Sequence, residues 1–158
     1  MTTPSESEIK SLVGHKFPGG KYTIEHWENF LLTDCTGAAQ LPDGRAHPVA
    51  LFHVSIMGAG TSIDEMFQLG QADSPFSISI ESYEWEFCSV LLEEHEYTVV
   101  GEVTEASRIR DSAKVQSKEY HGEFYDRIQF QFTLSDEQDS VAARVTITWH
   151  YNRGVNEH

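Results

Sequence analysis

The chain has 158 residues, a length that fits one domain with a core large enough to be stable without metals or disulfides. It carries 25 acidic and 11 basic side chains, and its formal net charge is −14. A surface for DNA, RNA or an anionic membrane needs clustered Lys and Arg, and the sequence contains no such cluster. Nucleic acids and membranes are therefore excluded as expected partners.

The sequence also indicates where the protein works. No apolar run reaches the roughly 18 residues of a membrane span, and residues 1–11 are polar and contain acids, unlike a signal peptide. Cys35 and Cys88 show no CxxC or zinc-ligand spacing. We expect a cytoplasmic protein with reduced thiols and with Cys35 in the core. Since no Gly-rich phosphate loop or metal-ligand spacing is present, we expect neither a cofactor nor a metal.

We expect residues 1–11 to be a polar lead-in, residues 12–153 to be a single domain and residues 154–158 to be a tail. Thr23 is a predicted N-cap for a helix that ends near Thr36. Acids in the first turn and a glycine directly after the end favour that helix.

Apolar residues between Pro48 and Leu69 recur every three or four positions, which is typical of one face of a long continuous helix. The apolar positions are Val49, Phe52, Ile56, Ala59, Ile63 and Met66. Proline is favourable in a first helical turn. Gly58 and Gly60 cost about 1 kcal/mol each relative to Ala in a helix interior. They indicate either the close approach of a backbone or ligand, or a simple kink or packing notch.

The remainder alternates with a period of two, which predicts strands with one apolar face. The alternating runs are Phe76-Ile78-Ile80, Tyr83-Trp85-Phe87, Ile128-Phe130-Phe132-Leu134 and Val141-Ala143-Val145-Ile147-Trp149-Tyr151. Residues 96–110 are long enough for a bent strand, and residues 135–139 predict a hairpin turn. A one-sided antiparallel sheet around one long helix is an α+β hot-dog fold.

The order of four segments resembles the MaoC-like hot-dog family of (R)-specific enoyl-thioester hydratases and 3-hydroxyacyl-thioester dehydratases. These segments are residues 12–17 with 22–24, residues 31–37, residues 44–49, and residues 83–87 followed by 97–105. The similarity runs from Val13 to Tyr151. It implies a substrate held as a thioester on CoA or acyl carrier protein. It also implies edge-to-edge pairing with a second hot-dog chain, as a homodimer or a heterodimer.

The chain departs from this family at the catalytic motif. Active members carry Asp-x-Asn-Pro-x-His after the glycine that ends the first helix, whereas residues 38–42 here read Ala-Ala-Gln-Leu-Pro. The long helix also lacks the family's His-Gly pair near its start. The chain therefore resembles subunits that lack the Asp/His dyad, for which the resemblance implies that a partner subunit supplies the pair.

His47 and His53 are the candidate bases, and Asp34 is the carboxylate nearest the lost motif. The two histidines lie six positions apart, so they do not share a helix face and do not form a metal pair. The start of the long helix is expected to offer an N–H group to the thioester oxygen. Each candidate also has a purely structural interpretation: loop histidine for His47, packing histidine for His53, and surface acid or cap for Asp34.

Phe52, Gly58, Gly60 and Trp85 are the candidate substrate-binding residues, although aromatic residues at strand spacing also fit a core or a dimer interface. The sequence thus predicts a subunit of a 3-hydroxyacyl-thioester dehydratase or 2-enoyl-thioester hydratase. The alternative is a non-catalytic or repurposed hot-dog module that binds a small apolar ligand or stabilises a partner. A thioesterase would need Asp64 or Glu65 as its carboxylate, and both lie late in the helix.

Overall fold

The computed structural model describes residues 3–110 and 124–154. Its five strands form one antiparallel sheet in the order β1-β3-β4-β5-β2. The strands are β1 (Gly20–Thr23), β2 (Ile78–Phe87), β3 (Glu96–Ile109), β4 (Phe124–Ser135) and β5 (Val141–Arg153). The helices are α1 (Glu6–Lys10), α2 (His26–Cys35), α3 (Ala50–Gly58), α4 (Ile63–Leu69) and the 3₁₀ turn η1 (Pro75–Ser77). The described part of the chain has no helix long and apolar enough to cross a membrane.

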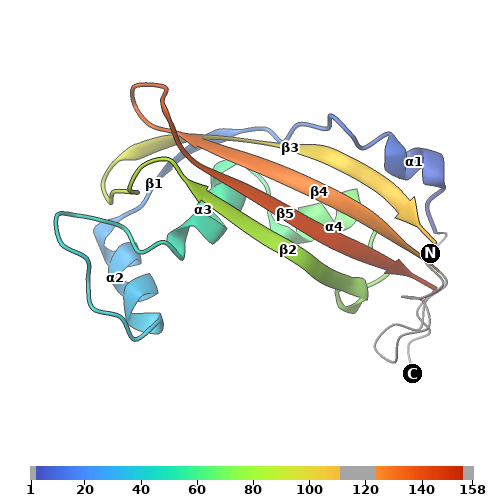
Figure 1. Cartoon of the computed structure of the whole chain (residues 1–158), viewed down its shortest axis with the longest axis horizontal. Coiled ribbons are helices and arrows are strands. Elements are labelled where there is room, and N and C mark those ends of the chain that lie inside the picture. Colours follow the sequence, from blue (N-terminus) through green and yellow to red (C-terminus); the bar gives the residue numbers. More distant parts are fainter. Residues whose placement is uncertain (1–2, 111–123, 155–158) are drawn as a thin grey trace.

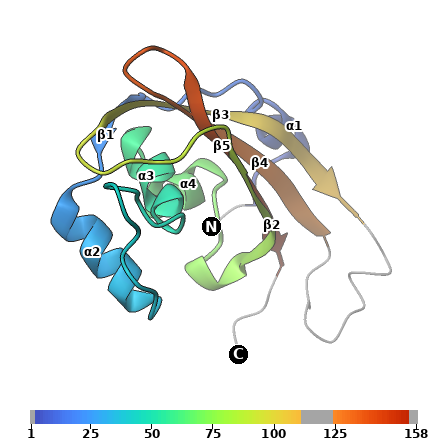
Figure 2. The same ribbon diagram turned by 60° about the vertical axis from the view of Figure 1, so that its left-hand side comes forward.

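The sheet curves around α3 and α4, which fill its inner face (Figure 1 and Figure 2). In the same views, α2 lies beyond one end of the sheet and α1 lies beside β3. The inner-face residues of β4 and β5 are buried because alternate side chains of a strand point to the same face. They include Ile128, Phe130, Phe132, Leu134, Val145, Ile147 and Trp149. The predicted α+β architecture, the bent third strand and the hairpin turn at residues 135–139 are confirmed.

Two predicted strands join into the single strand β2. A register shift between Ile80 and Ser82 changes which positions face inward, as a bulge does when it inserts an extra residue. Tyr83 pairs with Ile147 and therefore shares its inner face. Phe76, expected on the strand, instead lies in η1 and is 95% exposed.

The central helix is two helices, so the prediction of one continuous helix from Pro48 to Leu69 is wrong. Gly60 has φ +73°, and Ser62 is extended and caps α4 by accepting the Glu65 N–H at 3.2 Å. The apolar period crosses the break because both pieces pack on the sheet. In α4, for example, the Met66 carbonyl accepts the Tyr151 hydroxyl at 2.7 Å.

Two other boundaries also differ from the predicted ones. Thr23 ends β1 rather than capping a helix, and α2 begins after Glu25, whose N–H donates to Glu28 at 3.2 Å. The expected polar lead-in contains α1, which is capped by Ser5. Ile9 of α1 is 1% exposed, so this segment contributes to the core.

A buried ion network joins the far ends of three strands. Asp126 accepts hydrogen bonds from Arg108 at 2.7 and 2.9 Å and from Arg153 at 2.8 Å. Asp126 and Arg153 are fully buried. Arg153 also donates to the Gly70 carbonyl at 2.6 Å, and Arg108 to the Pro4 carbonyl at 2.7 Å. The network therefore fixes the N-terminal segment and the end of α4 to the sheet.

Asp126→Asn is expected to lower the free energy of unfolding by about 3–5 kcal/mol, because it leaves two guanidinium groups without their buried counter-charge. Chemical denaturation measures this change. The matched control is Asp34→Asn, at an exposed position on α2, which is expected to change stability by at most about 0.5 kcal/mol. Equal effects of the two variants would contradict the importance of the network.

Candidate functional site

Asn29 fixes α2 against the loop that leads into α3. It is 3% exposed, and its Nδ2 donates to the Arg45 carbonyl at 3.1 Å and to Glu93 Oε2 at 2.8 Å. Its Oδ1 accepts the His47 N–H at 2.9 Å. A buried amide with donor and acceptor both satisfied holds its neighbours in one arrangement, so Asn29 sets the position of His47.

His47 is fixed in a single tautomer by its own chain. Its Nδ1 accepts the Val49 N–H at 3.1 Å. A neutral imidazole that accepts at one nitrogen carries its proton on the other. Nε2 is therefore an N–H donor, and it has no hydrogen-bond partner among the described residues. This geometry favours a role as hydrogen-bond donor over the predicted role as base.

The first turn of α3 does not offer the free N–H that the sequence led us to expect. The N–H groups of Ala50, Leu51 and Phe52 donate to the carbonyls of residues 47–49 at 3.0, 3.0 and 3.2 Å. The tight turn after His47 thus uses the groups that a regular helix start leaves open. His47 Nε2–H is the donor that remains next to this turn.

His53 forms a cluster with Glu28 and Tyr22, which brings together α3, α2 and β1. Glu28 Oε1 lies 2.5 Å from His53 Nε2 and 2.5 Å from the Tyr22 hydroxyl. The Tyr22 and His53 rings meet edge to face with centroids 5.9 Å apart. The side chains of His53 and Glu28 are 24% and 12% exposed. The cluster links three elements. Among the described residues, His53 Nδ1 has no hydrogen-bond partner.

Glu28 carries a negative charge in this cluster. Burial raises the pKa of the Glu28 carboxyl, but the hydrogen bonds from Tyr22 and His53 outweigh burial, and the pKa lies below its ordinary value of 4.5. Burial and the neighbouring Glu28 carboxylate raise the pKa of the Tyr22 hydroxyl well above its ordinary range. Glu28 is therefore ionised and Tyr22 is protonated at neutral pH.

The three candidate catalytic residues do not come together. His47 bonds to Asn29, and His53 bonds to Glu28, while Asp34 lies exposed in the last turn of α2. The catalytic roles of all three stay predictions. Cys35, expected in the core, is exposed at the end of α2, and Cys88 is also an exposed free thiol.

The candidate substrate-binding residues occupy two regions. Phe52 is half-buried, and its ring meets Tyr83 edge to face at 5.6 Å. Trp85 lies on the edge strand β2 and is 38% exposed. Their contact with an acyl chain stays a prediction.

Packing and turn geometry account for both central glycines. A Cβ on Gly58 would lie 2.5 Å from Val99 Cγ2 and 3.3 Å from Tyr22 Cβ, so the missing side chain admits β1 and β3. Gly60 adopts the left-handed φ that ends α3. Of the two interpretations left open, the packing notch explains Gly58. Contact of either glycine with substrate stays a prediction.

An apolar hollow of about 440 Å³ is lined by the residues on either side of His47, while His47 itself is not part of the lining. We call it the apolar hollow; its lining residues are Leu41, Arg45, Ala46, Pro48, Phe87, Ser89, Val90 and Leu91. The loop before α3 forms one wall, and the chain after β2 forms the other. Ala46 and Pro48, the neighbours of His47 on both sides, are part of the first wall. An apolar chain fits this lining, to which Arg45 adds one positively charged residue.

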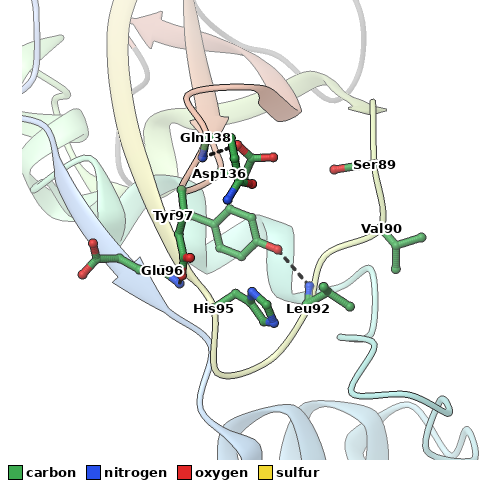
Figure 3. A pocket seen from close by; sticks show the side chains of 9 residues that line it. Ser89, Val90, Leu92, His95, Glu96, Tyr97, Asp136 and Gln138 are labelled. Atoms are coloured by element: carbon green, nitrogen blue, oxygen red, sulfur yellow. Dashed lines mark hydrogen bonds between the residues drawn. The ribbon is translucent and has the colours of Figure 1, made fainter.

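A second hollow, of about 300 Å³ and with a lining of mixed polarity, is shown in Figure 3 and shares Ser89 and Val90 with the apolar hollow. Tyr97, 3% exposed, accepts the Leu92 N–H at 2.9 Å in its wall. Asp136 lies opposite and accepts the N–H groups of Gln138 and Ser140, each at 2.9 Å. These bonds stabilise the loop and the hairpin turn.

The sequence did not reveal Glu28, Asn29 or Tyr22 as members of the site. Glu28 was notable only as an acid near a helix start, and it lies 25 residues from His53. No periodic pattern connects residues that meet only when two helices pack. The part of the site around His47 and Pro48 can be predicted from the sequence, because both residues lie in one segment.

Glu28→Gln is expected to lower the free energy of unfolding at pH 7 by about 1.5–3 kcal/mol, the value of hydrogen bonds to a charged group. Because the folded pKa of Glu28 lies below 4.5, this stabilisation is present above pH 4.5 and is lost as the pH falls through the folded value. Denaturant titrations at pH 7 and at acidic pH measure the gap in free energy of unfolding between variant and wild type. Glu65→Gln, exposed on α4, is the control; a gap that widens on acidification would contradict the assignment.

Gly58→Ala is expected to cost about 1–3 kcal/mol through overpacking against Val99. Val99→Ala in the same chain should recover part of that loss, because the smaller residue leaves room for the new methyl group. A double-mutant cycle by chemical denaturation measures the coupling. Purely additive effects would show that the two residues do not compete for this space.

Sequence comparisons give no relative for this chain. No protein-family model matches it, and no curated protein matches it.

Solved structures do resemble it. The ChsH1-ChsH2 complex from Mycobacterium tuberculosis is similar with a TM-score of 0.65 and 11% identity, over 96% of this chain and 90% of that one. The HadBC (3R-hydroxyacyl-ACP dehydratase) complex from the same organism has a TM-score of 0.61 and 6% identity, over 88% and 96%. A MaoC-like dehydratase from Rhodospirillum rubrum has a TM-score of 0.53 and 10% identity, over 90% and 94%. The similar structures also include a thioesterase. The chain therefore has the hot-dog fold, as its sequence predicted.

Proposed function

We propose that the chain is a subunit of a hydro-lyase that dehydrates 3-hydroxyacyl thioesters or hydrates 2-enoyl thioesters. One observation carries this proposal: Ala46 and Pro48, the residues on either side of His47, line an apolar hollow of about 440 Å³, and His47 Nε2–H has no partner among the described residues. Likeness in fold to the dehydratase of the HadBC complex supports it. An acyl thioester fits because it combines an apolar chain with one carbonyl oxygen that needs a donor.

In this reaction, loss of the α-proton moves negative charge onto the thioester oxygen. A preorganised donor aimed at that oxygen lowers the barrier. His47 Nε2–H is suited to this role, because Asn29 holds the His47 backbone, the Val49 N–H holds the ring and the helix N–H groups are already bonded. The proton transfers themselves need an acid and a base. Residues 38–42 lack the Asp/His pair, so a partner chain is proposed to supply it.

The partner is proposed to be a second hot-dog chain that adds to the edge strand β2. This strand presents ten residues on an edge where no strand of the described sheet pairs with it. On its inner face, Ile80, Trp85 and Phe87 are 63%, 38% and 43% exposed. An unpaired edge with uncovered apolar side chains is a ready template for another strand. The HadBC and ChsH1-ChsH2 structures are complexes, which supports this arrangement.

A second function, a non-catalytic hot-dog module, is favoured by the missing Asp/His pair alone. Such a module would bind a small apolar ligand in the same hollow, or stabilise a partner. The two functions differ in turnover and not in binding, so an activity assay separates them.

The test is hydration of 2-enoyl-CoA thioesters by the chain alone and after co-expression with candidate hot-dog partners. We expect turnover only in a complex, and a change of acyl-length preference when this chain is present. Stable complexes without any turnover would reject the hydro-lyase and leave the module. Absence of both binding and turnover would reject the partner as well.

His47→Asn tests the proposed donor within an active complex. The asparagine oxygen takes the place of Nδ1 and keeps an acceptor for the Val49 N–H, whereas the Nε2–H is removed. We expect kcat to fall about 10²–10³-fold, as for other oxyanion donors, with KM little changed. His47→Gln keeps a donor near the Nε2 position and should retain more activity. Equal activity of wild type and His47→Asn would contradict this role.

A further inference from the structure

Most cations in the described residues are neutralised by acids. The pairs are Lys10–Glu6, Lys21–Glu96, Arg108–Asp126, Arg127–Glu81, Arg144–Glu86 and Arg153–Asp126. Within residues 3–110 and 124–154, Arg45 has no acidic partner in the structure. Lys16 and Arg110 also have no acidic partner there, but among these three cations Arg45 is the one that lines the apolar hollow.

The backbone of Arg45 is held firmly although its side chain is exposed. Its N–H donates to the Pro42 carbonyl at 3.2 Å, its carbonyl accepts from Asn29 at 3.1 Å, and it forms a β-bridge with Leu92. Arg45 is one of the residues that line the apolar hollow. The backbone from which this side chain extends is thus fixed before a ligand binds, and the side chain remains to be ordered.

Glu93, an acidic side chain beside the residue that precedes Arg45, is already engaged elsewhere. Glu93 lies beside Gly44, but its Oε2 accepts from Asn29 at 2.8 Å and its Oε1 contacts His26 Nδ1 at 2.9 Å. Together with the charge of His26, these bonds hold the pKa of Glu93 below its ordinary value. The carboxylate is directed to α2, which leaves the Arg45 guanidinium open to an incoming anion.

We propose that Arg45 binds a phosphate of the pantetheine-linked arm that carries the acyl thioester. This inference rests on the proposed function and deepens it by naming the group that is recognised. An anionic ligand is repelled by a protein of charge −14, so it needs a local cation to be held. The planar guanidinium matches phosphate with two parallel hydrogen bonds. The apolar hollow beneath it would take the uncharged part of the arm.

Calorimetric titration of the full chain tests this without turnover. The ligands are CoA, 4′-phosphopantetheine and pantetheine, which has no phosphate. Arg45→Gln is expected to weaken CoA and phosphopantetheine about tenfold or more, as for a hydrogen bond to a charged group, and to leave pantetheine unchanged. Arg45→Lys should restore part of the affinity. The charge-matched control Lys16→Gln, at a residue on a different hollow, should leave all three affinities within about twofold.

The outcomes separate the sources of the phosphate and the two proposals. If Arg45→Gln weakens the binding of both CoA and 4′-phosphopantetheine, Arg45 binds the phosphate that the two ligands share. If the substitution weakens the binding of CoA alone, Arg45 binds a phosphate of the nucleotide part of CoA. Equal weakening of pantetheine, equal effects of Lys16→Gln, or no binding by the wild type would overturn the inference. Arg45-dependent binding without enoyl hydration in any complex would keep this site and reject the hydro-lyase.

Discussion

The structure depends on one buried charge, the Asp126 carboxylate between the guanidinium groups of Arg108 and Arg153. Taking three ionised groups out of water is costly unless each hydrogen bond is made. Here Arg153 also satisfies the carbonyls of Gly70 and Gln71, which the end of α4 would otherwise leave open. The network therefore determines where the second half of the broken central helix ends against the sheet.

At the opposite end, the hydrogen bonds of two residues of α2 perform the equivalent task. Asn29 joins α2 to the Arg45 carbonyl and to His47, and Glu28 joins the same helix to His53. Two adjacent residues of α2 thus hold the two histidines: Asn29 holds His47, and Glu28 holds His53. A shift of α2 would alter the position of His47 and the wall of the apolar hollow together, which makes α2 the element that sets the site.

The sheet was predictable because its signal is local. Alternation in β4 and β5 follows directly from a strand with one buried face, and the turn between them is short and polar. The apolar period does not predict the break between α3 and α4, since the period continues across the break, where Ser62 caps α4. The contact between Glu28 and His53 depends on how two helices pack, and no sequence spacing encodes that packing. The hot-dog fold was therefore accessible from the sequence, whereas the hydrogen-bonded partners of the site were not.

The two edges of the sheet differ greatly in length. β1 spans four residues and β2 spans ten, with a register shift near its start. When two copies of an edge join about a twofold axis, each edge is consumed by its counterpart. What is left exposed is the short β1, which gives little backbone for another strand to pair with. A pair formed through β2, as proposed above, would therefore expose only this short edge and would not continue into fibrils, a safeguard that resides in strand length and not in any single side chain.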